Sequence, residues 1–242
     1  MKNYTNTIII GITIVITSLI GVRALNKKMA SKELISVTGL GKKDFTADLI
    51  VWCGDFTRTN MDLQKAYQEL SKDNAAIKEY LVAKGVDEEE IIFSSIEIDQ
   101  EFEYYYDKNN NSSKKFLGYK LYQTVQIESK NVDKTEYISR QVTELINLGI
   151  EFYSQPPQYY YTKLAELKLE MVASATEDAR LRAEKIALNS GSKIGKLKNA
   201  RMGVFQIIAQ NSNEDYSWGG SFNTSSKMKT ATITMKLEFG IK

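Results

Sequence analysis

The chain has 242 residues, with 32 basic and 30 acidic side chains and a formal net charge of +2. Hydrophobic residues make up 43% of it, which predicts a packed core and excludes a largely disordered chain. Histidine is absent, which excludes Ser-His-Asp and Cys-His catalysis and every metal site that needs imidazole. The balanced charge, without a basic run in the body, predicts no nucleic-acid partner. We expect the single cysteine, Cys53, to be a buried and unreactive thiol.

Residues 1–30 form a separate, apolar N-terminal segment. No charged side chain lies between residues 3 and 22, and residues 8–22 are strongly apolar. This run is shorter than the roughly 20 residues that cross a bilayer, so we expect either a membrane anchor or a cleaved signal segment. Arg23 disrupts the small-residue cleavage pattern at Ala24, which favours the anchor. The basic residues that follow would, by charge alone, keep the body in the cytoplasm.

Strands and one helix are predicted over the first part of the body. Apolar and polar residues alternate in residues 45–56, which predicts a strand after a shorter one at residues 36–43. A helix is expected at residues 60–84, ended by Gly85 as a left-handed cap. Its buried stripe is predicted to contain Leu63, Tyr67, Leu70, Ile77 and Leu81. Two strand-like runs joined by the polar residues 107–115 then predict a long hairpin.

The second part of the body again mixes helices with strands. A helix is expected at residues 132–148, ended by Gly149, and it should bury Ile138, Val142, Leu145 and Ile146. The strand that follows contains Pro156 and Pro157, so it lies at a sheet edge or is interrupted there. A long helix is predicted at residues 162–190. The chain ends in strand-like residues 197–210, a loop at 211–226, and a clearly alternating strand at 227–242.

This order of elements predicts the α+β class. We expect mostly antiparallel sheets in two halves of the ββα and βαββ type, packed by three helices of which one is long and lined with alanine. Residues 31–242 then form one domain, with possible sub-halves at residues 31–130 and 131–242.

The long helix carries its smallest residues along one line. Alanine recurs at every fourth position, and the predicted inward line consists of Ala165, Leu169, Val172, Ala175, Ala179, Ala183, Ile186 and Ala187. Alanine keeps a helix surface low, so we expect this line to lie close against a sheet. Gly191 is expected to end the helix with a positive φ, and Gly195 to allow a tight turn into the next strand.

These residues resemble the hallmark helix of a known family. The pattern A-x3-A-x3-A-x3-A followed by G-x3-G is similar to that of the SIMPL-domain family of bacterial cell-envelope proteins. Further motifs match it in the same order, at Val37, Gly39, Gly41, Asp48, Gly85, Asp87, Ile91, Gly118, Tyr119, Gly149 and Phe152. The resemblance covers about residues 36–242, although the proline-containing turn that this family usually has before the last strand is absent.

The resemblance implies a cellular location but assigns no chemical activity. Proteins of this family are mostly periplasmic or envelope-associated, some form ring-like or channel-like oligomers, and some are linked to oxidative-stress tolerance. We therefore expect the body in the periplasm or cell envelope, exported or anchored to the inner membrane, against the charge asymmetry at the N-terminus. The family has no established activity, so the resemblance assigns no catalytic residue, cofactor or metal.

Three motifs suggest chemistry but are better explained structurally. Gly39 and Gly41 precede lysines, as in a phosphate-binding loop, but a strand follows in place of a helix, so we expect a bend between two strands. The loop that starts at Asp107 begins like a calcium loop but lacks its later ligands. The consecutive acids Glu88–Glu90 are expected to face water instead of forming a catalytic pair.

Aromatic residues provide the candidate contact surface. They are the two runs and one loop group Tyr104, Tyr105, Tyr106, Tyr159, Tyr160, Tyr161, Tyr216, Trp218 and Phe222. Aromatic side chains are enriched at interfaces. The favoured hypothesis is a non-enzymatic, homo-oligomeric envelope scaffold, tethered to the membrane by its N-terminal segment and linked to stress tolerance. The alternative is a small-molecule or glycan-binding module that uses the aromatic surface and the loop at residues 211–226.

Overall fold

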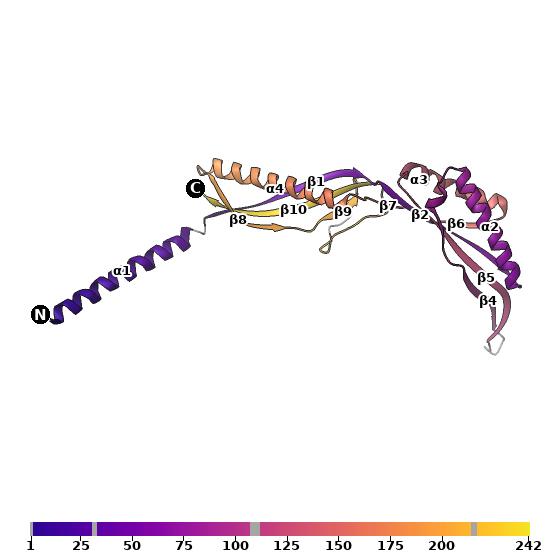
Figure 1. The fold of residues 1–242 in the computed structure, drawn as a ribbon, viewed down its shortest axis with the longest axis horizontal. Coiled ribbons are helices and arrows are strands. Elements are labelled where there is room, and N and C mark those ends of the chain that lie inside the picture. Colours follow the sequence, from indigo (N-terminus) through magenta and orange to yellow (C-terminus); the bar gives the residue numbers. More distant parts are fainter. Residues whose placement is uncertain (1, 31–32, 107–111, 214–216) are drawn as a thin grey trace.

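The computed structural model describes residues 2–30, 33–106, 112–213 and 217–242. The molecule is elongated, with an N-terminal helix followed by two sheet units arranged end to end (Figure 1). Helix α1 (Lys2–Ala30) has exposed side chains at residues 8–23. Among the residues described, no helix is both long and apolar enough to cross a membrane. The fold is α+β with antiparallel sheets, which confirms the predicted class.

The first unit, sheet A, is a four-stranded sheet with one helix on one face. Its strands are β1 (Leu34–Thr46), β10 (Met228–Ile241) and β8 (Ile194–Met202), in that order, with β9 (Gln206–Ala209) also paired to β10. Helix α4 (Leu164–Asn189) lies along β1 and β10. The alternate residues of β10 that point to α4 are buried, which confirms the predicted alternation of Ala231, Ile233, Met235, Leu237 and Phe239.

The second unit, sheet B, has six strands. Their order is β3 (Ile91–Phe93), β5 (Ser112–Ser129), β2 (Leu49–Asn60) and β6 (Glu151–Ser154), while β4 (Glu97–Tyr106) pairs with β5 and β7 (Gln158–Tyr160) pairs with β2. The predicted long hairpin is confirmed as β4 and β5. Pro156 and Pro157 separate β6 from β7, so the proline-containing strand is interrupted, as expected.

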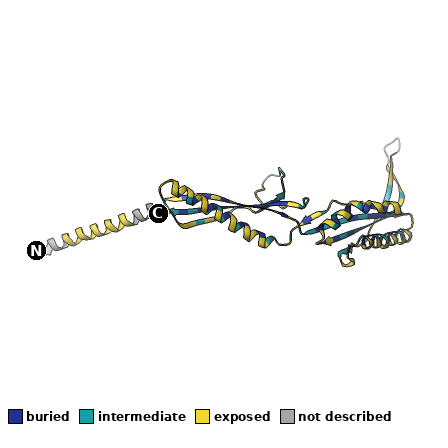
Figure 2. Ribbon diagram, turned by 90° about the horizontal axis from the view of Figure 1, so that it is seen from above, coloured by how far each residue is buried: buried dark blue, intermediate teal, exposed yellow. Residues whose placement is uncertain are grey.

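Two helices cover one face of sheet B. They are α2 (Leu63–Ala83) and α3 (Val132–Gln141), and short 3-10 helices occur at Glu88–Glu90 (η1) and Val142–Leu148 (η2). The core beneath them contains the fully buried Trp52 and Phe56. Figure 2 shows the buried residues in the helices and strands of both units, while residues 8–23 of α1 are exposed.

The chain passes between the units twice. β1 ends at Thr46 in sheet A and β2 begins at Leu49 in sheet B, and the chain returns between β7 and α4. The strands of sheet B therefore come from residues 49–160, whereas those of sheet A come from both sides of this range. The boundary at residue 130, suggested for the possible sub-halves, falls between β5 and α3, which belong to the same unit.

The buried stripes of the helices differ in part from those predicted. In α2, Leu63 and Tyr67 are 38% and 54% exposed, and Asp73 is buried instead because it forms an ion pair with Arg58. In α4, the buried line is Leu167, Met171, Ala175, Ala179, Ala183 and Ala187. A strict four-residue spacing follows an inclined row of the helix surface and suits a twisted sheet, so Leu169 and Ile186 fall outside it.

The second predicted helix also differs from its prediction. It changes at Val142 from an α-helix to the 3-10 helix η2. A 3-10 helix has three residues per turn, so its side chains no longer follow the α-helical period. Val142 and Leu145 are buried as predicted, but Ile146 is 58% exposed.

The alanine line brings the backbones of α4 and β1 into contact. A Cβ atom added at Gly39 would lie 2.1 Å from the carbonyl oxygen of Ala175 and 2.4 Å from the nitrogen of Ala179. A Cβ at Gly41 would lie 2.5 Å from the carbonyl oxygen of Met171. The expected close approach is confirmed. The predicted bend at these glycines is wrong, because both lie inside the continuous strand β1 and are small to admit the helix.

Three glycines end helices as predicted, but the tight turn predicted at Gly195 is not found. Gly85, Gly149 and Gly191 have φ values of +86°, +75° and +73°. Gly195 does not form a tight turn, because it already lies in β8. A Cβ there would lie 2.7 Å from the carbonyl oxygen of Gly240, so this glycine permits a close approach of neighbouring strands instead.

The carboxylate of Asp178 on α4 accepts a hydrogen bond from the backbone at the outer edge of β1. The backbone N–H of Leu40 donates a hydrogen bond to Asp178 Oδ2 over 2.8 Å, and Arg182 Nε donates to Asp178 Oδ1 over 3.1 Å. These two contacts hold the pKa of Asp178 below its ordinary value. Because the helix covers this backbone N–H of the edge strand, it also discourages pairing of β1 with another chain at this point.

Substitution of Ala179 by leucine tests the helix–strand contact. The larger side chain has no space against Gly39, so we expect Ala179→Leu to lower the free energy of unfolding by about 1–3 kcal/mol. Urea denaturation would measure this loss. Ala173→Leu is the matched control on the exposed face of the same helix. Equal stability of the two variants would mean that the alanine line does not determine the packing.

The contribution of Asp178 should depend on pH. Because its folded-state pKa is lowered, the charged form stabilises the fold above the unfolded pKa, and this stabilisation is lost as the pH falls through the folded pKa. At pH 7 the wild-type chain should exceed Asp178→Asn in free energy of unfolding by roughly 0.5–1 kcal/mol, since partial exposure weakens the effect. Denaturation at several pH values should show this difference disappearing below pH 3.8. A difference that is independent of pH would contradict the assignment.

Candidate functional site

The two sheet units are joined where the chain crosses between them. The Asp48 carboxylate accepts hydrogen bonds from the backbone N–H and the hydroxyl of Thr162, at 2.7 and 2.8 Å. The Ala47 N–H donates to the Lys227 carbonyl oxygen over 2.9 Å, and the Asp48 N–H to that of Tyr160 over 3.0 Å. The acidic position of the opening motif therefore connects both crossings of the chain.

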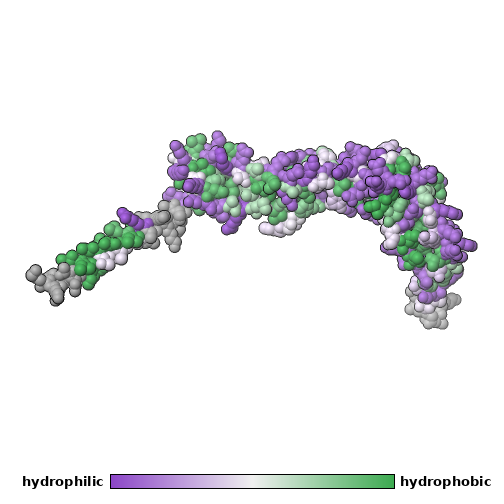
Figure 3. All heavy atoms as spheres, in the orientation of Figure 1, coloured by the Kyte–Doolittle hydropathy of each residue, from purple (hydrophilic) through white to green (hydrophobic). Residues whose placement is uncertain are grey.

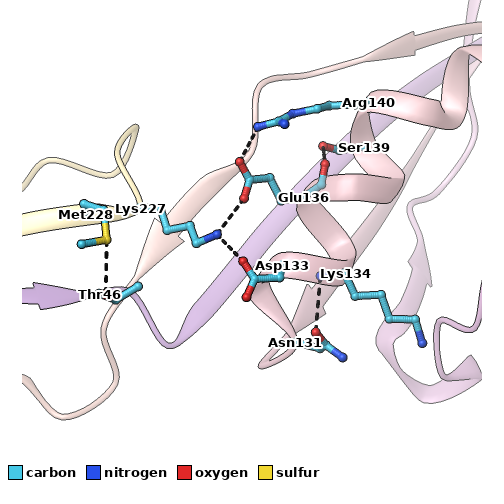
Figure 4. Close-up of polar contacts among 9 residues, drawn as sticks. All are labelled: Thr46, Asn131, Asp133, Lys134, Glu136, Ser139, Arg140, Lys227 and Met228. Carbon is cyan, nitrogen blue, oxygen red and sulfur yellow. Dashed lines mark hydrogen bonds and ion pairs between the residues drawn. The ribbon is translucent and has the colours of Figure 1, made fainter.

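An ionic cluster spans the same junction (Figure 4). Lys227, next to β10, forms ion pairs with Asp133 and with Glu136 of α3, the latter at 3.0 Å. Arg140 also donates to Glu136, over 2.5 Å. Hydrogen bonds to Asp133 and Glu136 raise the pKa of Lys227. The cluster links sheet A to a helix of the sheet B unit, so it is a structural contact between units.

The second tyrosine run belongs to this junction. Tyr159 is only 7% exposed and packs with Ala47, Ile50 and Val132. Burial raises the pKa of Tyr159, and the nearby Glu136 raises it further. The ring of Tyr161 lies 4.8 Å from that of Phe45, and Tyr160 is partly exposed. Most of this run therefore packs inside the molecule.

The first tyrosine run lies on a projecting hairpin. We call the hairpin formed by β4 and residues 112–122 of β5 the arm. β2 ends at Asn60, opposite Tyr119 of β5, so residues 112–118 of β5 project beyond β2 and pair with β4. Tyr104 and Tyr105 are 62% and 43% exposed, and the side chain of Tyr106 lies outside the described residues. At the base of the arm the register shifts beside Gly118, whose φ of +142° accounts for the glycine of that motif.

The arm has two different faces. On the side that carries the helices, the ring of Phe116 lies 5.6 Å from Phe102 and 5.2 Å from Tyr119. Ile98 lies on the same side, opposite the buried Leu121, and is 53% exposed. The other side carries an alternating row of acids, Glu97, Asp99, Glu101 and Glu103. The sequence analysis did not single out this row, although the alternation in EIDQEFE was the signal that reveals it.

A polar groove continues from the acidic row across sheet B. It has a volume of about 470 Å³ and is lined by residues of β2, β4, β5 and β6, including Asp55, Asp99 and Lys120. Asp55 accepts hydrogen bonds from Thr124 Oγ1 over 2.7 Å and from Gln155 Nε2 over 2.6 Å. Within the described ranges, no three acidic or cysteine side chains converge in a way that could hold a metal ion.

The loop near β9 presents the third aromatic group. Trp218 is 98% exposed, and the ring of Phe222 lies 6.3 Å from that of Phe205. Tyr216 lies outside the described residues. Gln206 holds the loop by accepting from the Ser217 N–H at 3.1 Å and donating to the Ser217 carbonyl oxygen at 3.2 Å. Beside Trp218 lies a groove of about 480 Å³ lined by uncharged residues, Leu40, Val204, Gln206, Ser217, Thr232, Ile233 and Thr234.

The predicted aromatic residues therefore do not gather on one surface. They lie in three places: on the arm, at the junction and in the loop beside β9 (Figure 1). Two exposed surfaces remain as candidate sites, the two-faced arm and the groove at Trp218. Neither brings together the groups of a hydrolytic or redox centre among the described residues.

The comparison with known proteins agrees with this fold. No curated protein matches the chain. A family model described as "SIMPL: Protein of unknown function (DUF541)" matches residues 35–238. The match begins in β1 and ends in β10, so it includes both units and the crossings between them. This confirms the resemblance found in the sequence: the chain belongs to the SIMPL family, whose function is unknown.

Proposed function

We propose that this chain is a non-enzymatic scaffold protein of the cell envelope that assembles with further copies of itself. The observation that carries this proposal is the apolar side of the arm. Ile98 is 53% exposed there and lies beside Leu63 and Tyr67 at the start of α2, which are 38% and 54% exposed. Tyr104, further along the same side of β4, is 62% exposed. A contiguous exposed apolar surface is typical of a contact site for another protein.

The N-terminal helix supports a tethered location. The apolar side chains of residues 8–22 are between 51% and 61% exposed, and they lie on all sides of α1. A helix that is apolar all round suits a nonpolar environment such as a membrane. In Figure 3 this apolar helix and the arm lie at opposite ends of the molecule. A tether at α1 would thus hold the arm far from the membrane surface, in the periplasm if the family resemblance applies.

The chemistry of the side chains supports a structural role. The sequence has no histidine to act as a base near neutral pH. Burial, followed by the negative charge of Asp55, raises the pKa of the Cys53 thiol, which disfavours the nucleophilic thiolate. The buried carboxylate of Asp73 forms an ion pair with Arg58. A part in stress tolerance, as the family resemblance implies, would then come from the assembly.

A second candidate function rests on the groove at Trp218. A fully exposed indole beside hydroxyl and amide groups, with uncharged side chains at every described position of the lining, suits an uncharged ligand such as a neutral glycan. Apolar sugar faces stack on aromatic rings, and Thr232 and Thr234 would offer hydrogen bonds to sugar hydroxyls. This function would not require assembly.

The scaffold proposal predicts self-association through the arm. We expect the full-length chain in detergent to have a molar mass of more than one copy, measured by light scattering with the detergent contribution subtracted. Replacing Ile98 and Tyr104 by serine should remove exposed apolar area and shift the mass towards one copy. Leu169→Ser is the matched control, because Leu169 is 74% exposed on α4. A wild-type chain that stays monomeric at every concentration tested would exclude the proposal.

The glycan proposal predicts a change in fluorescence at Trp218. The chain has two tryptophans, and Trp52 is fully buried, so quenching by a ligand in solution reports on Trp218. Maltohexaose and chitotetraose are suitable neutral probes. Saturable quenching that disappears in Trp218→Ala and weakens in Thr234→Val would support the site. Emission that is unchanged at millimolar sugar would argue against it.

A further inference from the structure

The strands β4 and β8 present two exposed sheet edges. Among the described residues, β4 pairs only with β5, and β8 pairs only with β10, so each has one edge without a neighbouring strand. The two strands have similar lengths, 10 and 9 residues. An edge of this kind can accept a strand from another chain through its backbone N–H and C=O groups.

The two edges carry opposite charge on matching faces. The acidic row of β4 lies on the side of sheet B away from α2 and α3, because Ile98 between two acids is opposite the buried Leu121. In β8, Arg201 is opposite Lys236, on the side of sheet A away from α4. Lys196 and Lys198 flank Leu197, which is opposite the buried Phe239. All three basic residues are exposed, and no ion pair to them is found within the described ranges.

The helix-side faces of the two edge strands both carry apolar residues. β4 presents Ile98 and Tyr104 there, and β8 presents Leu197 and Met202, which are 49% and 64% exposed. In one continuous sheet, acids would lie beside bases on one face and apolar side chains beside apolar side chains on the other. Cross-strand pairs of both kinds stabilise a sheet.

We propose that β4 of one copy pairs with the outer edge of β8 of a second copy. This interface rests on the scaffold function proposed above and names its partner surface. Pairing of β4 with another β4 would bring acids together, since alternate positions of both strands on that face are acidic, and like charges opposite each other are destabilising. The lysines of β8 likewise disfavour a basic partner strand, because like charges would lie opposite each other.

The geometry points to a head-to-tail arrangement. The arm and β8 lie in different units, towards opposite ends of the body (Figure 1), so a single copy cannot satisfy both edges itself. An interface between two different surfaces of the same chain is heterologous, and repetition of it builds a closed ring or an open filament. The interface also predicts that association weakens with salt, because exposed charges contribute to it.

Charge reversal tests this interface with the full-length chain in detergent. One variant carries Glu97→Lys and Asp99→Lys, and the other carries Lys196→Glu and Lys198→Glu. Each variant alone should place like charges on both edges, and we expect its dissociation constant for self-association to rise at least about tenfold. An equimolar mixture should restore assembly, because basic β4 would face acidic β8 and acidic β4 would face basic β8. A single chain with all four substitutions should also assemble.

Two controls separate this interface from general charge effects. Glu89→Lys with Glu177→Lys raises the net charge as the β4 variant does, and Lys72→Glu with Lys185→Glu lowers it as the β8 variant does. All four positions are exposed and outside both edges, so both controls should leave the mass unchanged. Circular dichroism must show native-like folding for every variant. Variants that assemble as the wild-type chain does would overturn the β4–β8 interface while leaving the scaffold proposal standing. Loss in both variants without rescue in the mixture would also overturn it, as would an effect confined to β8. A monomeric wild-type chain would reject both proposals.

Discussion

The contact between the alanine line of α4 and the glycines of β1 is the constraint on which the architecture depends. At Gly39 and Gly41 there is no space for a side chain, because backbone atoms of Ala175, Ala179 and Met171 occupy it. Among the described residues, α4 is the helix that packs on sheet A, so the core of this unit lies between α4 and the strands. Small residues on both surfaces reduce the buried apolar area per residue but allow dense contacts along the whole helix.

The crossing of the chain at Ala47 and Asp48 transmits this constraint to the second unit. β1 and β2 are nearly continuous, so the position of β1 under α4 also fixes where the chain leaves sheet A and enters sheet B as β2. Hydrogen bonds to Asp48 and the ionic cluster at Lys227 then hold the return crossing and α3 at the same point. The elongated shape, with the arm far from α1, follows from units joined end to end instead of packed face to face.

The elongated shape leaves surfaces of different chemistry exposed at different places on the molecule. The sequence has no histidine, and partial burial raises the pKa of the Cys53 thiol. By contrast, the arm exposes apolar residues on one face and three acids on the other, where a fourth, Glu101, is half-buried and pairs with Lys120. β8 exposes a basic edge at a distance from it. These surfaces are the basis for the proposed pairing between copies of the chain. The groove at Trp218 is the exception, because its uncharged lining and exposed indole suit a soluble ligand.

The sequence by itself determined the local features of this protein. Periodicity located most helices and strands, glycine marked the helix ends at Gly85, Gly149 and Gly191, and the ordered motifs identified the family. These signals depend on neighbours within a few residues, which the sequence displays directly. Only the tertiary structure decided that Gly39 and Gly41 are a helix contact and not a bend, that Tyr159 is buried while Trp218 is exposed, and that residues 49–160 form one unit inserted into another. Those outcomes depend on contacts between segments up to about two hundred residues apart, such as β1 with β10, and no local pattern specifies which segments will meet.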